Sequence, residues 1–294
     1  MDVKKLNILV TGGCGQLGCC LRDAAKGSPQ HYVFTDVVEL PGLETVRLDI
    51  TDRDALRAVA AKENIDIIVN CASYTNVEKA EDEPALAKLL NATAVEGLAA
   101  VAAERGATLI HISTDFVFGG DATAPIREDA APAPLSVYGA TKLEGERAAQ
   151  ACKSIVLRTA WLFSQYGKNF VKTMLSLTAD RPQIKVVADQ TGTPTYARDL
   201  AKLIVHIIDS GQYGKTGIYN FTNEGVATWH EFASAVNELA GHHCDVQPCR
   251  TDEYPAKARR PHYSVLDKSL VKKTFGISIP DWHDALKDCL KKLL

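Results

Sequence analysis

The chain has 294 residues, of which 46% are hydrophobic and 23% charged, and its formal net charge is −3. This composition is typical of a soluble globular protein, and the length suits a large α/β domain with a smaller second lobe. Because the chain has no basic excess and no apolar run near ~18 residues, we expect no nucleic-acid partner and no membrane span.

The first half of the chain alternates strand and helix patterns. Strands are predicted at 6–12, 32–36, 44–49, 66–73 and 108–115, and helices at 16–26, 51–64 and 84–105. The strands are continuously apolar rather than alternating, which is typical of a parallel sheet covered on both faces. The fold class predicted is therefore α/β, with a doubly wound, Rossmann-type parallel sheet.

The second half begins with a loop at 118–136 and a helix that contains Tyr138 and Lys142. Strands are then predicted at 154–163, 184–189 and 217–222, and helices near 195–209, 228–240 and 281–293. After about residue 164 the strand and helix patterns no longer alternate regularly. We therefore expect a dinucleotide-binding domain at 1–163 and a mainly substrate-binding lobe at 164–294, with some of its chain free to return to the first domain.

A glycine-rich turn follows the first predicted strand. The stretch "VTGGCGQLGCCL" places Gly12, Gly15 and Gly18 between that strand and a helix. Glycines here allow backbone amides to approach a pyrophosphate at the helix N-terminus, although a tight turn with close helix packing has the same pattern. Asp36 ends the second strand, 18 residues after Gly18, where a carboxylate binds the adenosine ribose and repels a 2′-phosphate. The combination predicts a nicotinamide dinucleotide, with NADH favoured over NADPH.

Two further strand ends are candidates for the same crevice. Asp49 and Ile50 close the third strand and could bracket an adenine, although a plain helix-capping region has the same sequence. Ala72, Ser73 and Tyr74 close the fourth strand, where small residues would leave room for the nicotinamide end of a cofactor.

The helix after the long loop carries a tyrosine four residues before a lysine. Tyr138 and Lys142 would lie one helical turn apart, and Thr114 ends the fifth strand. An ammonium beside a phenol should lower the phenol pKa from its usual value of about 10 and make the phenol a better proton donor. Thr114 could donate its hydroxyl to a substrate oxygen. Taken alone, Tyr138 and Lys142 could be two exposed side chains on a surface helix. The upstream glycine turn favours the alternative that they act with Thr114 in the reduction of a carbonyl group.

These stretches together resemble the extended short-chain dehydrogenases/reductases, and within them the dTDP-4-dehydrorhamnose reductases. The matching segments include "TGGCGQLG", "VNCASYTNVEKAEDEP", "HISTDFVFGG", "VYGATKLEGE" and "RRPHYSVLD", and they span residues 11–267 in the family's order. The resemblance implies a nucleotide-sugar 4-ketoreductase that uses NADH or NADPH to reduce dTDP-4-dehydrorhamnose to dTDP-L-rhamnose, with a tyrosine as proton donor.

The resemblance also implies roles for individual residues. The cofactor pyrophosphate would contact Gly15, Gln16 and Leu17, and the rest of the cofactor site would be lined by Asp36, Asp49, Ile50, Ala72, Ser73 and Tyr74. The substrate would contact Thr114, Asp115, Trp161, Asn169, Gln190 and Arg260. Arg259 and Arg260 are candidates for the nucleotide diphosphate, because guanidinium groups suit phosphate oxygens, or they are a solvated basic pair. Trp161 could instead be a core aromatic. Many relatives carry a histidine where this chain has Tyr74.

Two other functions remain open on the sequence. A similar fold serves as the non-catalytic regulatory subunit of methionine adenosyltransferase, and a nucleotide-sugar epimerase or dehydratase would carry the same cofactor motif.

The eight cysteines contain no Cys-x-x-Cys pair and are expected to be reduced thiols of a cytoplasmic protein. Some related enzymes form magnesium-bridged dimers; we expect no metal here, and a homodimer is possible.

Overall fold

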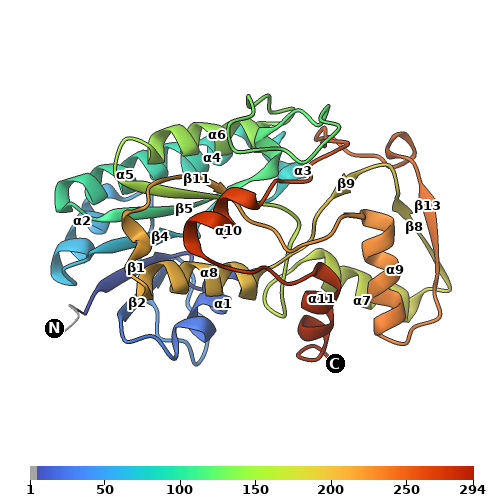
Figure 1. The fold of residues 1–294 in the computed structure, drawn as a ribbon, viewed down its shortest axis with the longest axis horizontal. Helices are drawn as coiled ribbons and strands as arrows, with labels where there is room; N and C mark the ends of the chain where they lie inside the picture. The colour runs from blue at the N-terminus through green and yellow to red at the C-terminus, as the bar shows by residue number, and fades with distance from the viewer. Residues whose placement is uncertain (1–4) are drawn as a thin grey trace.

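The computed structural model describes residues 5–294, and a seven-stranded parallel sheet forms its larger part (Figure 1). The strand order is β3-β2-β1-β4-β5-β6-β11, with every neighbouring pair parallel. The strands are β1 Asn7–Thr11, β2 His31–Asp36, β3 Val46–Arg47, β4 Ile67–Asn70, β5 Thr108–Thr114, β6 Ser154–Thr159 and β11 Gly217–Asn220. The predicted doubly wound α/β fold is confirmed.

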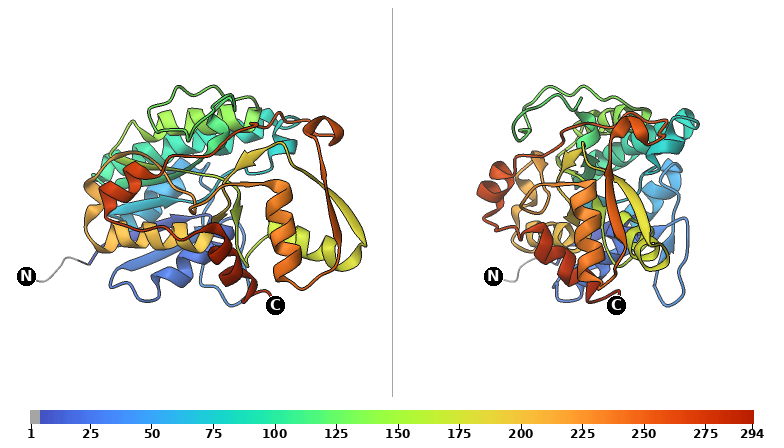
Figure 2. Two further views of the ribbon diagram at one scale, coloured as in Figure 1. Left: turned by 45° about the vertical axis from the view of Figure 1, so that its right-hand side comes forward. Right: turned by 90° about the vertical axis from the view of Figure 1, so that its right-hand side faces the viewer.

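Helices cover both faces of this sheet, as Figures 1 and 2 show. One face packs on α1 (Gln16–Ala25) and α8 (Ala197–Asp209), and the other on α2 (Arg53–Lys62), α5 (Ala94–Arg105) and α6 (Val137–Ala149). Within β1, Ile8 and Val10 join the first core, whereas Leu9 joins the second. This alternation explains why the strand sequence is apolar at every position.

The topology creates a crevice at the carboxyl ends of the central strands. β1 pairs with β2 on one side and β4 on the other. The connection after β1 therefore leads to one side of the sheet, and the connection after β4 leads to the other side. Loops after the carboxyl ends of β1 and β4 diverge at this point, and ligands of open α/β sheets bind there.

The predicted helix at 84–105 is interrupted in the structure. It consists of α4 (Pro84–Lys88), a π-helical turn (Leu89–Thr93) and α5. This 22-residue stretch has the length and apolar composition of a membrane span, which the sequence reading did not recognise. However, 56% of its most apolar window is buried inside the protein, as in the core helix of a globular domain.

A smaller lobe occupies the other end of the molecule (Figure 2). Its core contains Phe163, Phe232, Val236, Trp282 and Leu286. The elements around this core are α7 Phe170–Asp180, β8 Gln183–Val187, α9 Trp229–Leu239, β13 Asp245–Cys249 and α11 Trp282–Leu290. β11 and α8 follow α7 in sequence but pack with the large sheet.

The remaining elements are short. They are α3 Val77–Ala80, 3-10 turns Asp115–Val117, Gln212–Gly214 and Thr251–Glu253, β7 Leu162–Phe163, β9 Thr191–Gly192, β10 Thr195–Tyr196, β12 Ala227–Thr228 and α10 Ser269–Phe275. Asp52 caps α2, because its carboxylate accepts a hydrogen bond from the Ala55 amide at 2.9 Å. The predicted strand 154–163 instead ends at Thr159, before Trp161 adopts a left-handed backbone with φ of +47°.

Candidate active site

A cavity of about 760 Å³ lies at the carboxyl ends of the central strands. Every predicted site residue lines it except Tyr74 and Gln190. These are Gly12, Gly15, Gln16, Leu17, Asp36, Asp49, Ile50, Ala72, Ser73, Thr114, Asp115, Tyr138, Lys142, Trp161, Asn169 and Arg260. Residues from distant parts of the sequence therefore share one concave site, as the topology of the sheet requires.

The glycine turn sits where a larger side chain would collide with backbone. Gly12 has φ of +66°, and a Cβ on it would lie 2.6 Å from the Ala72 nitrogen. A Cβ on Gly18 would lie 2.2 Å from the Gly12 carbonyl oxygen. Gly15 caps α1, so the first-turn N–H groups of this helix lack intrahelical acceptors and face the turn. This cradle of glycines at a helix N-terminus fits the pyrophosphate of a dinucleotide.

Asp36 lines the cavity and is fixed by two backbone hydrogen bonds. One carboxylate oxygen accepts from the Cys14 amide at 2.9 Å, and the other accepts from the Val38 amide at 3.1 Å. The charge is therefore held at the wall rather than free to swing into solvent. This placement fits a ribose hydroxyl as the ligand and opposes a phosphate at the same position.

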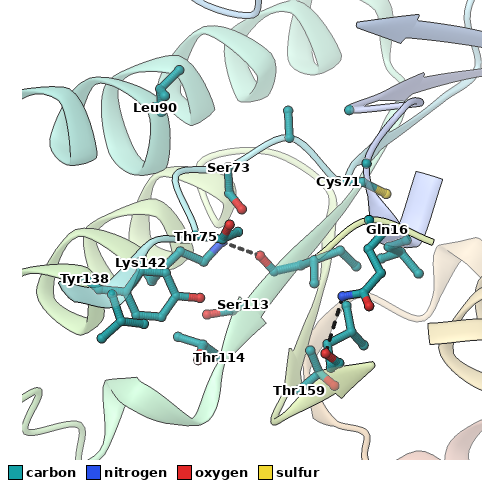
Figure 3. Close-up of a pocket in the computed structure, with 18 of the residues that line it drawn as sticks. Gln16, Cys71, Ser73, Thr75, Leu90, Ser113, Thr114, Tyr138, Lys142 and Thr159 are labelled. Atoms are coloured by element: carbon teal, nitrogen blue, oxygen red, sulfur yellow. Dashed lines mark hydrogen bonds between the residues drawn. The ribbon is translucent and has the colours of Figure 1, made fainter. Parts of the chain in front are cut away.

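The tyrosine and lysine project from α6 toward the end of β5 (Figure 3). The helix begins after Ser136, whose hydroxyl accepts from the Gly139 amide at 3.2 Å. A Cβ on Gly139 would lie 2.2 Å from the Phe116 carbonyl oxygen, so α6 rests directly on the chain that follows Thr114. This close contact places the phenol and the threonine hydroxyl on the same side of the cavity.

Lys142 is deeply buried. Only 3% of the residue is exposed, and its ammonium donates to the Ile112 carbonyl oxygen at 2.6 Å. Burial lowers the pKa of Lys142 to about 8, while Glu146, one helical turn further along α6, opposes that shift. The lysine is therefore a buried cation that loses its proton near pH 8.

The predicted lowering of the Tyr138 pKa is wrong in this structure. Burial raises the pKa of Tyr138 to about 12, the Thr114 hydroxyl opposes the shift, and the Asp115 carboxylate reinforces it. Desolvation disfavours the phenolate more than any neighbouring group favours it. Tyr138 is consequently protonated at neutral pH, which is the state that a proton donor requires before reaction.

Asp115 lies beside this pair. Its carboxylate accepts from the Thr114 hydroxyl at 3.0 Å, and burial raises the pKa of Asp115 to about 6. The Thr114 oxygen in turn accepts from the Phe116 amide at 3.2 Å. These bonds fix the rotamer of Thr114 at the cavity wall.

Trp161 stands at the opposite wall in a strained conformation. Its indole stacks on Trp229 with ring centroids 3.6 Å apart and planes inclined by 12°. Left-handed backbone is costly for a bulky residue and is maintained only where surrounding packing enforces it. Trp161 packs against the core of the smaller lobe and also lines the cavity, so its position fits both the core-aromatic and the cavity-lining alternatives.

Sequence reasoning missed Asn91, which connects the chain after β4 with α6 next to the cavity. Its side-chain amide exchanges hydrogen bonds with the Tyr74 backbone at 2.8 and 3.1 Å and donates to the Thr141 hydroxyl at 3.2 Å. Asn91 lies in the π-helical turn, a feature common at functional sites. No periodicity in the sequence marks this residue.

Two predicted residues lie elsewhere. The Tyr74 hydroxyl donates to Glu83 at 2.5 Å, and Tyr74 does not line the cavity. Gln190 lines a second cavity of about 580 Å³, which shares Phe170, Trp229 and Arg260 with the first. The two cavities therefore meet at those three side chains. Within residues 5–294 there is no group of three or more His, Cys, Asp or Glu placed to hold a metal ion.

Comparisons with known proteins agree with this fold. The family model of the RmlD substrate binding domain matches residues 6–294. A dTDP-4-dehydrorhamnose reductase of Mycolicibacterium smegmatis is 41% identical, over 99% of this chain and 86% of its own. The solved dTDP-4-dehydrorhamnose reductase of Clostridium acetobutylicum superposes with a TM-score of 0.91 at 39% identity, covering 98% of this chain and 99% of its own. The solved dTDP-4-dehydrorhamnose reductase of Bacillus anthracis, in complex with NADP, superposes with a TM-score of 0.89 at 35% identity. The superposition covers 98% of this chain and 100% of the Bacillus anthracis chain.

Proposed function

The chain belongs to the dTDP-4-dehydrorhamnose reductase family, and from this premise we propose that it reduces the C4 ketone of dTDP-4-dehydrorhamnose to dTDP-L-rhamnose. It is a nicotinamide-dependent oxidoreductase. The observation that carries the proposal is the convergence of Thr114, Tyr138 and Lys142 on one cavity that also contains the glycine cradle.

A nicotinamide dinucleotide held by the glycine cradle and Asp36 would supply the hydride that reduces the ketone carbon. Tyr138, protonated at neutral pH because burial raises its pKa, gives its proton to the oxygen that becomes the alcohol. The Thr114 hydroxyl, whose single proton is donated to Asp115 in this structure, turns to donate it to that oxygen when the ketone binds, while the Phe116 amide holds the threonine oxygen in place. The Lys142 ammonium stabilises the phenolate that Tyr138 leaves behind.

The second cavity suits the nucleotide end of this substrate. It is lined by four basic side chains, Arg181, Lys185, Arg259 and Arg260, together with apolar groups such as Met174 and Val186. Guanidinium groups match phosphate oxygens, and an apolar wall suits a nucleobase. Because Arg260 also lines the first cavity, a dTDP sugar would cross the junction with its diphosphate beside this arginine.

A turnover assay tests the reaction directly. The 4-keto sugar, made in situ by an upstream dehydratase and epimerase, is supplied with NADH, and loss of the reduced nicotinamide absorbance is followed. We expect stoichiometric NADH consumption and a dTDP-L-rhamnose product. An epimerase would leave NADH unconsumed, and a regulatory subunit would show no turnover, so either outcome would refute the proposal.

The cofactor preference is proposed to be NADH, because the Asp36 carboxylate is fixed at the adenosine end. For Asp36→Asn we expect the ratio of kcat/KM with NADH to kcat/KM with NADPH to fall about tenfold, since loss of the charge removes repulsion of the 2′-phosphate. Asp54→Asn, an exposed carboxylate on α2, is the matched control. An unchanged ratio in Asp36→Asn would contradict this assignment.

The buried lysine predicts an alkaline limit to activity. Below about pH 8 Lys142 carries its proton and stabilises the phenolate; above that pH the charge is lost. We therefore expect kcat/KM for the sugar to be level near neutrality and to fall about tenfold per pH unit above the lysine pKa. The measurement is a pH–rate profile, with Lys142→Met expected to abolish this inflection. A wild-type profile still level at pH values well above 8 would contradict the assignment.

A further inference from the structure

A strap formed by residues 250–262 connects the smaller lobe back to the large sheet. It leaves β13, passes beside α3 in both Figures 1 and 2, and is followed by a parallel bridge between Tyr263 and Thr191. Near its end, a Cβ on Gly120 would lie 2.6 Å from Pro261, so this part of the strap packs closely on the loop after β5. The strap carries Arg260, which lines both cavities.

Glu78 on α3 makes most of the polar contacts between that helix and the strap. One carboxylate oxygen accepts from the Arg260 guanidinium at 2.8 Å. The other accepts from the backbone amides of Lys257 at 2.8 Å and Ala258 at 3.3 Å. Partial burial opposes ionisation, but these three hydrogen bonds outweigh it and lower the pKa of Glu78. The carboxylate is therefore charged and fully engaged by the strap.

A second ion pair joins the same two segments. The Lys257 ammonium lies 2.6 Å from an Asp82 carboxylate oxygen, at the carboxyl end of the turn after α3. Lys257 and Asp82 are both largely exposed, so solvent weakens this pair. Glu78 and Arg260 are less exposed, at 38% and 31% of their side chains, and their pair adds directed hydrogen bonds.

Arg260 retains hydrogen-bonding capacity toward the cavities. Nη2 is bound to Glu78, whereas Nη1 donates to no group among residues 5–294 and the side chain remains 31% exposed; the buried Nε has no partner there either. An unsatisfied guanidinium N–H beside the junction of two cavities suits an anionic oxygen of a ligand. The Glu78 contact restricts the rotamer of Arg260 and leaves this donor available.

We propose that Glu78 is a positioning residue that fastens the strap and aims Arg260 at the diphosphate of the nucleotide sugar. The inference rests on the proposed function, because it takes the diphosphate to lie where the two cavities meet. It also assigns a role to the "NVEKAEDEP" stretch, which the reaction itself leaves unused.

The sign of one substitution separates positioning from simple electrostatics. Glu78→Gln removes a negative charge near an anionic substrate, so Coulomb repulsion alone predicts a lower KM. Positioning predicts the opposite. We expect KM for the nucleotide sugar to rise about tenfold, while kcat and KM for NADH change less than about twofold. Glu104→Gln, which removes the same charge from the exposed pair with Arg57, is the matched control and should leave all three constants unchanged.

A double-mutant cycle completes the test. Arg260→Ala should raise KM by itself, and adding Glu78→Gln to it should have no further effect, because the two residues act through one contact. Titration of dTDP by calorimetry gives the same comparison without turnover. A KM that is unchanged or lowered in Glu78→Gln, additive effects in the cycle, or equal dTDP affinity for wild type and Glu78→Gln would overturn the inference. Absence of turnover in wild type together with weaker dTDP binding by Glu78→Gln would refute the reductase function and retain the positioning role.

Discussion

Replacement of Tyr138 by phenylalanine is expected to lower kcat for ketone reduction by about 10²- to 10⁴-fold. The substitution removes the phenol hydroxyl, which is the proton donor in the proposed reaction. Its ring is expected to stay in place, because Tyr138 packs edge-to-face on Phe116 with centroids 5.5 Å apart, and phenylalanine can make the same contact. NADH binding, measured by fluorescence titration, should change little.

The matched control deletes a phenol hydroxyl outside the cavity. Tyr74→Phe removes a hydrogen bond to Glu83 but no group that lines the cavity, so kcat should stay close to that of wild type. Full turnover in Tyr138→Phe would contradict the assignment of Tyr138 as the proton donor. Equal losses in both variants would indicate general damage to the fold rather than a catalytic role for Tyr138.

Replacement of Glu146 by alanine is expected to destabilise the protein by about 3–5 kcal/mol, because it leaves a buried cation unpaired. Glu146 and Arg158 are each about 2% exposed, and two guanidinium nitrogens lie 2.9 and 2.7 Å from the carboxylate oxygens. The same carboxylate accepts from the Ser113 hydroxyl at 2.5 Å. The free energy of unfolding, obtained from urea denaturation, is the measurement.

Two further variants are compared with Glu146→Ala: one breaks an exposed ion pair, and the other replaces both buried charges by apolar side chains. Glu104→Ala breaks the exposed pair with Arg57 and should have little effect on stability, since solvent already screens that pair. The double variant Glu146→Leu with Arg158→Met replaces both charges by apolar groups and should recover much of the lost stability. Equal destabilisation by Glu146→Ala and Glu104→Ala would contradict a burial-dependent cost.

Glu146 also connects stability with catalysis. It lies one helical turn after Lys142, and its charge raises the lysine pKa against the larger effect of burial. The residues Tyr138, Lys142 and Glu146 therefore form one face of α6, with the proton donor at one end and a structural anchor at the other.

The local features of the fold were predictable because they depend on short stretches of sequence. The strand at 6–12, the glycine turn and Asp36 lie within 36 residues, and backbone sterics and strand geometry determine their arrangement. The spacing of Tyr138 and Lys142 likewise follows from one helical turn. Predicted boundaries failed where tertiary contacts override local preference, as at Trp161, whose left-handed backbone is held against Trp229.

The sequence by itself determined the class of sheet and indicated the glycine turn after β1 and the one-turn spacing of Tyr138 and Lys142, the pair proposed to react, since periodicity and helical spacing are local properties. The protonation states of Tyr138 and Lys142 were decided only by the tertiary structure, because desolvation depends on every element packed around α6 and reverses the shift expected for the phenol. Tertiary structure likewise brought Glu78 to Arg260, which lie 182 residues apart in the chain. Contacts at such separation arise from the path of the strap and leave no periodic signal in the sequence.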